Sequence, residues 1–460
     1  MQTVLDQIRA AFPPEGLFAD KEWILSPEPF FIGDKLYDDL EKLGYRLNLF
    51  NRACNELYHQ SVAGKQPRWV ADYLDRGKPP ELVELSRQKQ FRQEVPLVIR
   101  PDLVLTDEGF TIAEVDSVPG GIGLTGWLNQ TYAKLGFDIV GGATGMIDGF
   151  RDIVGGNAEI LVSQEAATYR PEMEWLARSV GGSALRVSDA ENFQMDRLLA
   201  GYQQAAQAQA AQAAGQGASG QAGSAAGVPT VYRFFEHFDL PNLPAVRPLM
   251  DAARDGQARV TPPFKPYLEE KMWFALFWLR PLRDFWRREL SERHFLKLQE
   301  HIPYTWLLDP QPLPQHAVVP GLDINSWQEL ASFGQKHREL ILKISGFHET
   351  AWGSRSVVLG SDLSQGDWLE AIRHALAAFE QHPHILQRFH KGRLVEQPFF
   401  APADCSIQRM RGRVRLCPYY FVIDGKAQMR GALATVCPAD KKLLHGMKDA
   451  ILVPTAVKPE

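Results

Sequence analysis

The sequence predicts a mixed protein that combines an α/β unit built on a parallel sheet with an α+β part built from antiparallel hairpins. The first observation is the order strand, helix, strand over residues 158–187, which is typical of a parallel βαβ unit. The second is a charged hairpin pattern at residues 100–116. The third is a pair of strand patterns, 414–423 and 428–436, joined by Asp424-Gly425, which is a strong hairpin-turn signal.

Length and composition are those of a soluble globular protein with two or three domains. The chain has 460 residues, of which 45% are hydrophobic and 23% charged, and its net charge is -5. The negative charge and the lack of a nucleic-acid-binding motif argue against a nucleic-acid partner. The sequence predicts neither a membrane span nor a signal peptide. Four cysteines without CxxC spacing indicate a reducing compartment, so a cytoplasmic location is expected. The sequence carries no signal for oligomeric state.

Residues 1–95 are expected to be mainly helical and to pack on the domains that follow. Residues 34–44 carry apolar side chains at helical spacing, and Gly44 stands where a glycine commonly ends a helix.

The segment 100–116 predicts a hairpin whose ionisable side chains share one face. Because side chains alternate along a strand, Arg100 and Asp102 point to the same face, as do Glu114 and Asp116. Residues 107–109, Asp-Glu-Gly, fit a three-residue loop with glycine in the left-handed position. That loop sets a register in which Asp102 lies opposite Glu114 and Arg100 lies opposite Asp116. Three carboxylates and one guanidinium then meet at the end of a rigid element.

Two interpretations of this charged face are open. Hairpins often carry charge on a solvated face, where opposite charges across the strands stabilise the pairing modestly. Asp102 opposite Glu114 argues for a bound cation instead, because like charges directly opposite each other are destabilising. Hard cations such as Mg2+ prefer oxygen ligands, and phosphate prefers a nearby arginine.

A glycine-rich turn at residues 118–126 follows the hairpin and leads into a helix that ends near Leu135. Backbone N–H groups at such a helix start can hold an anion, although a tight turn without a ligand explains the glycines equally well. The turn is not a P-loop, because no Gly-Lys-Ser/Thr closes it.

In the βαβ unit, Glu165 and Tyr169 are expected beyond the carboxyl end of the strand 158–163, where ligands of α/β proteins commonly bind. Residues 201–228 are nearly all Ala, Gln, Gly and Ser. Because this stretch has no apolar stripe, we expect a solvated, disordered insertion there. A strand at 230–235 follows it.

The last part of the chain predicts an aromatic-rich helical core followed by a second α/β arrangement. Residues 269–300 are helical in pattern, and their tryptophans and phenylalanines are expected in the core. A strand at 340–344 contains Lys343 and leads into a glycine-punctuated loop at 346–355. A strand at 357–359, a helix at 367–382 and a strand at 384–389 follow. A lysine at the end of a strand can neutralise phosphate while backbone amides of the loop close over it.

Taken together, these features resemble the ATP-grasp superfamily, which clamps ATP between two α+β subdomains. Metal ligands of that family follow the pattern Asp, then Glu twelve residues later, then Asn or Asp two further on. Asp102, Glu114 and Asp116 match this spacing, and Arg100 matches an arginine two residues before the aspartate. In ordinary members the lysines precede this hairpin, whereas here the hairpin precedes Lys343. That order is similar to the circularly permuted branch that includes glutathionylspermidine synthetase.

The resemblance implies a circularly permuted ATP-grasp fold with a Rossmann-like pre-ATP-grasp βαβ domain. It divides the chain into a helical region at 1–95, the metal-binding hairpin and following helix at 96–150, and the Rossmann-like domain at 151–250. The lysine, hinge and C-terminal strand subdomains would occupy residues 251–460.

The resemblance also implies a metal site and a catalytic arginine. Asp102, Glu114 and Asp116 would bind one or two Mg2+ ions that bridge the phosphates of ATP. Arg100 would stabilise charge on the transferring γ-phosphoryl group. Synthetases of this branch more often have Asn at the position of Asp116, and the extra charge should tighten metal binding.

The implied ATP-binding residues are Lys271, Lys343, Gly353, Ser354, Gln387 and Arg430. The two lysines would contact the phosphates or adenine, and Gln387 would lie in the hinge beside adenine. The loop containing Gly353 and Ser354 would cover the triphosphate, although 347–352 departs from the usual glycine-rich pattern. Arg430 would hold a phosphate or an acyl-phosphate, unless it forms a structural salt bridge.

The leading hypothesis is an ADP-forming ligase that uses ATP and Mg2+. A small or peptide carboxylate would be activated as an acyl-phosphate and captured by an amine, or by a thiol. The resemblance leaves two alternatives open: a phosphotransferase whose acceptor is a hydroxyl, and an ATP-binding protein without turnover. The acceptor pocket is expected near the glycine-rich turn, Glu165 and Tyr169. No amidase domain of the bifunctional glutathionylspermidine enzymes is expected.

Overall fold

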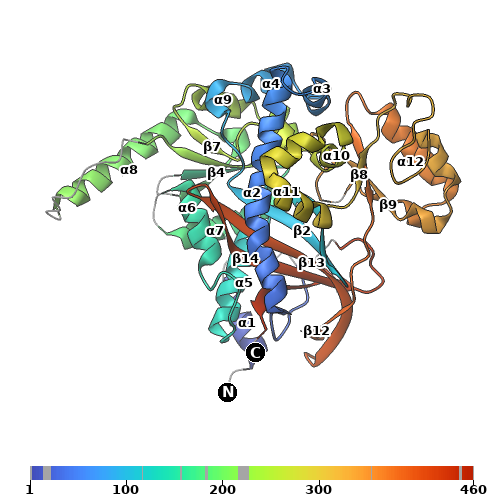
Figure 1. The fold of residues 1–460 in the computed structure, drawn as a ribbon. Helices are drawn as coiled ribbons and strands as arrows, with labels where there is room; N and C mark the ends of the chain where they lie inside the picture. Colours follow the sequence, from blue (N-terminus) through green and yellow to red (C-terminus); the bar gives the residue numbers. More distant parts are fainter. Residues whose placement is uncertain are drawn as a thin grey trace.

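Three β-sheets organise the chain, with helices packed around and between them (Figure 1). The computed structural model describes residues 3–13, 22–116, 118–155, 158–181, 185–215, 227–353, 355–444 and 448–458. Over these residues one sheet has seven strands, and two sheets have four strands each. The mixed α/β class expected from the sequence is therefore confirmed.

The seven-stranded sheet joins segments from both ends of the chain. Its strands are β1 (Phe30–Ile32), β2 (Val98–Thr106), β3 (Gly109–Asp116), β12 (Val395–Phe400), β13 (Ile407–Ile423), β14 (Lys426–Pro438) and β15 (Ile451–Val457). Their order is β1-β15-β14-β13-β2-β3, with β12 also paired to β13. Neighbours are antiparallel except β1 and β15, which are parallel. The hairpin β2–β3 thus lies beside a strand from near the end of the chain.

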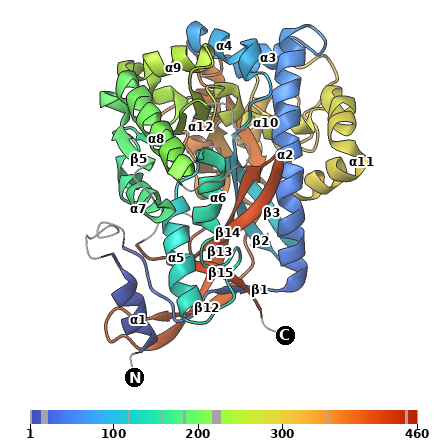
Figure 2. The same cartoon turned by 90° about the vertical axis from the view of Figure 1, so that its left-hand side faces the viewer.

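Helices cover both faces of this sheet. The long helix α2 (Asp34–Val62) packs on β14, and α5 (Ile122–Lys134) and α6 (Gly145–Val154) lie on the opposite side (Figure 2). The short helices α1 (Val4–Ala11), α3 (Trp69–Leu74) and α4 (Pro80–Ser86) complete the N-terminal region.

The prediction that Gly44 ends its helix is wrong, because α2 continues for 29 residues. A Cβ at Gly44 would meet the ring of Tyr420 at 2.4 Å. Glycine at this position therefore serves the close approach of α2 to β13, and not the end of a helix.

The parallel sheet contains β4 (Ala158–Val162), β5 (Leu185–Asp189), β6 (Thr230–Phe234) and β7 (Arg259–Thr261), in the order β5-β4-β6-β7. Helix α7 (Arg170–Val180) connects β4 to β5, which pair in parallel, so the predicted βαβ unit is confirmed. Helix α9 (Arg247–Arg254) leads to β7.

Helix α8 (Met195–Gly215) projects from this unit (Figure 1). The expectation of a disordered insertion at 201–228 is wrong for residues 201–215, which continue the helix. Alanine and glutamine are strong helix formers even without an apolar stripe, and this propensity outweighs the missing burial. Residues 216–226 lie outside the described residues.

The third sheet contains β8 (Thr305–Leu307), β9 (Leu340–Ile344), β10 (Val358–Leu359) and β11 (His384–Arg388), in the antiparallel order β10-β9-β11-β8. It has its own core, to which Trp368 of α12 (Gln365–Ala377) contributes. Helices α10 (Met272–Trp278) and α11 (Arg283–His301) bury Trp273, Phe274 and Trp286, as expected of this aromatic segment. No described helix has the length and apolarity to span a membrane.

Candidate active site

The hairpin β2–β3 has the predicted register at its charged end, but its turn and the pairing near that turn differ from the prediction. Arg100 pairs with Asp116, and Asp102 pairs with Glu114, as expected. The predicted three-residue loop is wrong, because Thr106 pairs with Gly109 and leaves a two-residue turn. A β-bulge next to Asp102 inserts Ala113 and restores the expected register.

Asp102 is enclosed by donors from its own strand and from β13. Arg100 Nε and Arg415 Nη1 lie 3.0 and 3.1 Å from its two carboxylate oxygens. Cys417 Sγ donates a hydrogen bond of 3.3 Å to Oδ1. Burial, reinforced by the charge of Asp102, raises the pKa of Cys417 to about 12, so the thiol keeps its proton and remains a donor. Arg415 and Cys417 therefore hold the side chain of Asp102 in place.

Arg100 also binds Asp116, which lies opposite it at the open end of the hairpin, and the turn that follows β3. Its Nη2 lies 2.9 Å from Asp116 Oδ2, and its Nη1 donates to the carbonyl of Gly120 at 3.1 Å. Asp116 accepts a second hydrogen bond from Val118 N at 2.9 Å. Burial, together with the charge of Glu114, raises the pKa of Asp116 despite the attraction of Arg100.

The two predicted lysines approach the hairpin from different elements. Lys271, just before α10, places Nζ 3.7 Å from Glu114 Oε2 and donates to the carbonyl of Ala351 at 2.7 Å. Lys343 of β9 donates at 3.0 Å to the carbonyl of Ala113 and at 3.0 Å to Gln387 Oε1. The bulge thus has a use, because its inserted residue supplies a carbonyl to Lys343. Burial lowers the pKa of Lys343 to about 8.

Two cavities meet at this hairpin. The larger, called here the acidic cavity, has a volume of about 160 Å3 and lies among the hairpin, the ends of β4 and β6 and the loop 346–353. The second, called the inter-sheet cavity, has about 100 Å3 and lies between the hairpin and strands β9 and β11. Asp102, Glu114 and Arg415 line both of them.

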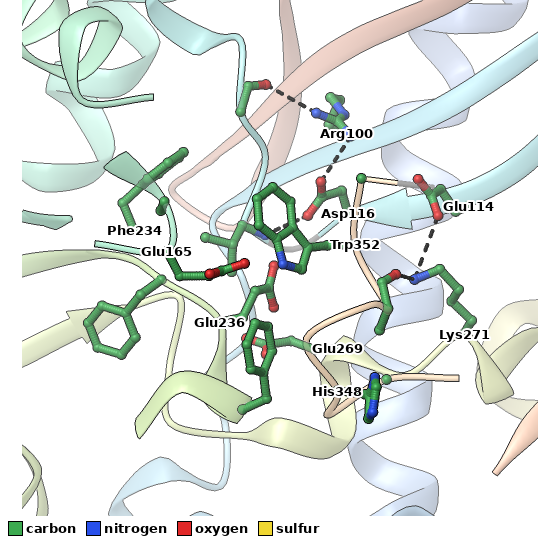
Figure 3. Close-up of a pocket in the computed structure, with 18 of the residues that line it drawn as sticks. Arg100, Glu114, Asp116, Glu165, Phe234, Glu236, Glu269, Lys271, His348 and Trp352 are labelled. Carbon is green, nitrogen blue, oxygen red and sulfur yellow. Dashed lines mark hydrogen bonds and ion pairs between the residues drawn. The ribbon is translucent and has the colours of Figure 1, made fainter. Parts of the chain in front are cut away.

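The acidic cavity takes its name from the carboxyl groups on its walls (Figure 3). Glu165 follows β4 and Glu236 follows β6, at the carboxyl ends of these parallel strands. Glu165 and Tyr169 thus line a cavity where the βαβ pattern placed them. Among the described residues that line it, carboxyl groups outnumber lysine and arginine side chains. The carboxyl groups are those of Asp102, Glu114, Asp116, Glu165, Glu236 and Glu269, and the lysine and arginine side chains are those of Arg100, Lys271 and Arg415.

Glu236 and Glu269 are neighbouring acids with opposite pKa shifts. Burial and the nearby charges of Glu269 and Asp116 raise the pKa of Glu236 well above its usual range. Burial alone would also raise the pKa of Glu269, but the ion pair with Arg233 and the contact with His237, whose Nδ1 lies 2.7 Å away, hold it at about 2. Burial lowers the pKa of His237 itself to about 4, so Arg233 is the permanent positive charge beside Glu269. When the pair holds a single proton, these opposite shifts favour that proton on Glu236 and the charge on Glu269.

The loop 346–353 forms one wall of the acidic cavity. Trp352 faces the cavity (Figure 3). The guanidinium carbon of Arg355 lies 4.3 Å from the centroid of the Trp352 ring. Arg355 Nη1 also lies 3.0 Å from Glu165 Oε1, which joins the loop to the segment after β4. Gly353 lines the cavity, and Ser354 lies outside the described residues.

Arg430 lines neither cavity. It lies 3.6 Å from Asp152 and donates to Gln428 at 2.7 Å, which is the structural salt bridge that the sequence left open. Gln387 lines the inter-sheet cavity, but its amide is bound to Lys343 and to Thr305 Oγ1 at 3.3 Å.

The glycine-rich turn before α5 holds an anion supplied by the protein itself. The buried carboxylate of Glu172 accepts hydrogen bonds from Gly121 N at 2.7 Å and Leu124 N at 3.2 Å. This carboxylate occupies the helix start that the sequence offered to a ligand.

The metal assignment of Asp102, Glu114 and Asp116 stays a prediction. Within the part of the chain that the structure describes, no group of three or more His, Cys, Asp and Glu residues is arranged to hold a metal ion. The oxygen-only donor set suits Mg2+ chemically, and two of the three carboxylates face each other across the strands. Each of these carboxylates lies beside Arg100, Arg415 or Lys271, so a bound metal ion would share the carboxylate oxygens with these side chains.

Sequence reasoning missed the roles of Arg415, Cys417, Glu236 and Glu269. The spacing of two between Arg415 and Cys417 does place both on one face of a strand. Nothing local in the sequence indicates that this strand lies beside Asp102, which is 313 positions earlier than Arg415.

The sequence matches no protein-family model and no curated protein. Among solved structures, a glutathione synthetase-like effector from Globodera pallida, in apo form, matches with a TM-score of 0.50 and 10% identity, covering 99% of this chain and 97% of that one. A putative gamma-glutamylcysteine synthetase from Methylobacillus flagellatus matches with a TM-score of 0.39 and 12% identity, covering 88% of each chain. The first likeness concerns the fold alone.

Proposed function

We propose that this protein is an ADP-forming ligase of the circularly permuted ATP-grasp type, which uses ATP and Mg2+ to join a carboxylate to an amine. The observation that carries the proposal is the meeting of two cavities at Asp102, Glu114 and Arg415. A phosphoryl group passes directly from ATP to a second substrate only when both are bound next to each other, and these residues lie where the two cavities meet. The name of the structural neighbour with a TM-score of 0.50, a glutathione synthetase-like effector, supports the same reaction class.

In this proposal ATP occupies the inter-sheet cavity with its phosphates toward the hairpin. Lys343 and Gln387 line that cavity, and Lys271 reaches Glu114 from the other side. The hairpin comes early in the chain, but in the sheet it pairs with β13, which comes late in the chain. This pairing supports the permuted order. The parallel order β5-β4-β6-β7 supports a Rossmann-like domain that supplies the walls of the acidic cavity.

The reaction needs positioning and charge compensation more than a covalent nucleophile. Mg2+ held by the hairpin carboxylates would withdraw charge from the phosphates. Arg100 and Arg415 would face the γ-phosphoryl group while a substrate carboxylate attacks its phosphorus and ADP leaves. The amine would then attack the acyl carbon of the acyl-phosphate, which releases phosphate and a proton.

The acidic cavity supports an amine as the second substrate. An ammonium group is attracted by the net negative charge of this lining, whereas a neutral hydroxyl acceptor gains hydrogen bonds but no charge attraction. Glu165 and Glu236 project into the space beside Trp352 (Figure 3). We therefore place the amine at this end of the cavity and the phosphoryl group at Arg100.

Single-turnover reaction with labelled ATP, Mg2+ and a screen of carboxylates and amines tests the proposal. ADP and phosphate should appear together, and Asp102→Asn should abolish both turnover and Mg2+-dependent nucleotide binding. Asp107→Asn, in the exposed turn of the same hairpin, is the matched control and should leave both unchanged. Release of AMP and pyrophosphate would contradict the mechanism, and a stably phosphorylated product would indicate a hydroxyl acceptor. Nucleotide binding without any turnover would support an ATP-binding protein.

A further inference from the structure

A buried ion pair connects the N-terminal region to the candidate site. Lys78 lies between α3 and α4, and its Nζ is 2.5 Å from Glu270 Oε1. The two side chains are 1% and 2% exposed. Burying a lysine together with a carboxylate costs free energy, because both charges lose their hydration.

Glu270 is in turn bound by the end of strand β9. Ser345 Oγ donates to Glu270 Oε2, and the same hydroxyl accepts a hydrogen bond of 2.8 Å from Met272 N. The carbonyl of Ser345 accepts 2.8 Å from Lys271 N. The peptide N–H groups on both sides of Lys271 are therefore bound by Ser345, the residue that follows β9.

The same network fixes the start of the loop 346–353. A Cβ at Gly346 would meet Glu270 Cδ at 2.9 Å, so the loop begins in direct contact with this carboxylate. Lys78 Nζ also lies 5.6 Å from the ring centroid of Phe347, which lines the acidic cavity. The contacts of Lys78 thus reach both the base of Lys271 and the base of the loop.

We infer that Lys78 is a positioning residue, which through Glu270 and Ser345 sets the relative placement of Lys271 and the loop 346–353. The inference rests on the proposed function, in which Lys271 reaches the charged centre at Glu114 and the loop 346–353 borders the acidic cavity beside it. Lys271 already contacts the loop through the carbonyl of Ala351, so a shift of either element changes the other.

A neutral double variant tests the inference. Lys78→Met alone leaves Glu270 charged, buried and unpaired, which risks misfolding. Lys78→Met/Glu270→Gln removes both charges, while the Gln carbonyl can still accept from Ser345. Ser345→Ala removes the hydroxyl and keeps the ion pair. Lys65→Met is the matched control, because Lys65 is a lysine of the same N-terminal region whose side chain is exposed.

We expect the double variant and Ser345→Ala to fold, with KM for ATP raised about tenfold or more and kcat changed less than threefold. Lys65→Met should leave both stability and KM for ATP unchanged. Folded variants with wild-type KM for ATP would reduce Lys78 to a structural role and overturn the inference.

Hydrogen exchange separates this inference from the proposed function, since it needs no ATP. Exchange of the amides in 271–275 and 345–353 should accelerate at least tenfold in the double variant, while β4 remains protected as in the wild type. Unchanged exchange in both segments would overturn the inference whether or not the protein binds nucleotide. Absence of Mg-nucleotide binding by the wild type would instead contradict the proposed function, and accelerated exchange would still support the placement by Lys78.

Discussion

At the scale of single residues, Lys343 links the charge of the site to pH. Its Nζ donates to two neutral oxygens, those of Ala113 and Gln387, and burial lowers its pKa to about 8. A bound triphosphate would favour the protonated lysine and raise this pKa. Nucleotide affinity should therefore be constant below pH 8 and fall above it, by up to about tenfold per pH unit.

The check is the dissociation constant of a non-hydrolysable Mg-ATP analogue between pH 7 and 9.5. Lys343→Arg should remove the decline, because an arginine keeps its charge over this range. The same decline in the arginine variant would assign the titration to another group.

The charged pairs themselves were predictable at this scale, and their surroundings were not. Arg100, Asp102, Glu114 and Asp116 lie within one hairpin, so strand alternation and a local register place them together. Cys417 and Arg415 reach Asp102 only because β13 pairs with β2. Such long-range pairing depends on the whole fold and leaves no trace in local spacing.

At the scale of elements, the start of α5 depends on a carboxylate from α7. Glu172 accepts from Gly121 N and Leu124 N, and it is fully buried. In Glu172→Gln one carboxylate oxygen becomes an NH2 group that faces a backbone N–H, and the interaction with the helix dipole is lost. We expect a loss of about 1–3 kcal/mol in the free energy of unfolding.

Urea denaturation measures this loss. Glu174→Gln is the control from the same helix, since Glu174 is half exposed and pairs weakly with Arg170; it should cost less than about 0.5 kcal/mol. Equal losses in the two variants would show that the cap contributes nothing specific.

The hairpin shows where element-scale prediction succeeds and where it fails. The register derived from a three-residue loop predicted the correct pairing of Arg100 with Asp116. The turn was wrong by one residue, and the bulge at Ala113 compensates for that residue. A bulge has no strong sequence signature here, because alanine is tolerated on both regular and bulged strands. Its reason lies in the carbonyl that it offers to Lys343 from another sheet.

At the scale of the whole molecule, the site exists because three sheets meet. The hairpin belongs to the seven-stranded sheet, Lys343 to the antiparallel sheet, and Glu236 follows a strand of the parallel sheet. The βαβ unit was predictable because its pairing is local, whereas the insertion of β2 between β3 and β13 was not. Packing between these units should therefore determine whether the cavities form.

Gly77 tests this packing, since it lies where the N-terminal region contacts the unit that contains β8–β11. Nearby, Arg76 places its guanidinium carbon 4.4 Å from the ring centroid of Phe379. Gly77 has a φ of 69°, and a Cβ there would meet the carbonyl oxygen of Gln381 at 1.9 Å. Gly64 has a φ of 72° with nothing within 4 Å of its Cβ position, which makes it a matched control.

Gly64→Ala should cost about 1 kcal/mol of unfolding free energy, the strain of a left-handed alanine. Gly77→Ala carries the same strain and must also push two backbone segments apart, which should cost about 1–3 kcal/mol more. Because Gln381 leads through Pro383 to Ser345 N, this movement reaches the base of the loop 346–353 and should weaken nucleotide binding in Gly77→Ala alone. Urea denaturation and nucleotide titration of both variants measure these effects. Equal stability losses, with equal nucleotide affinity, would mean that the two units do not need this close contact to build the site.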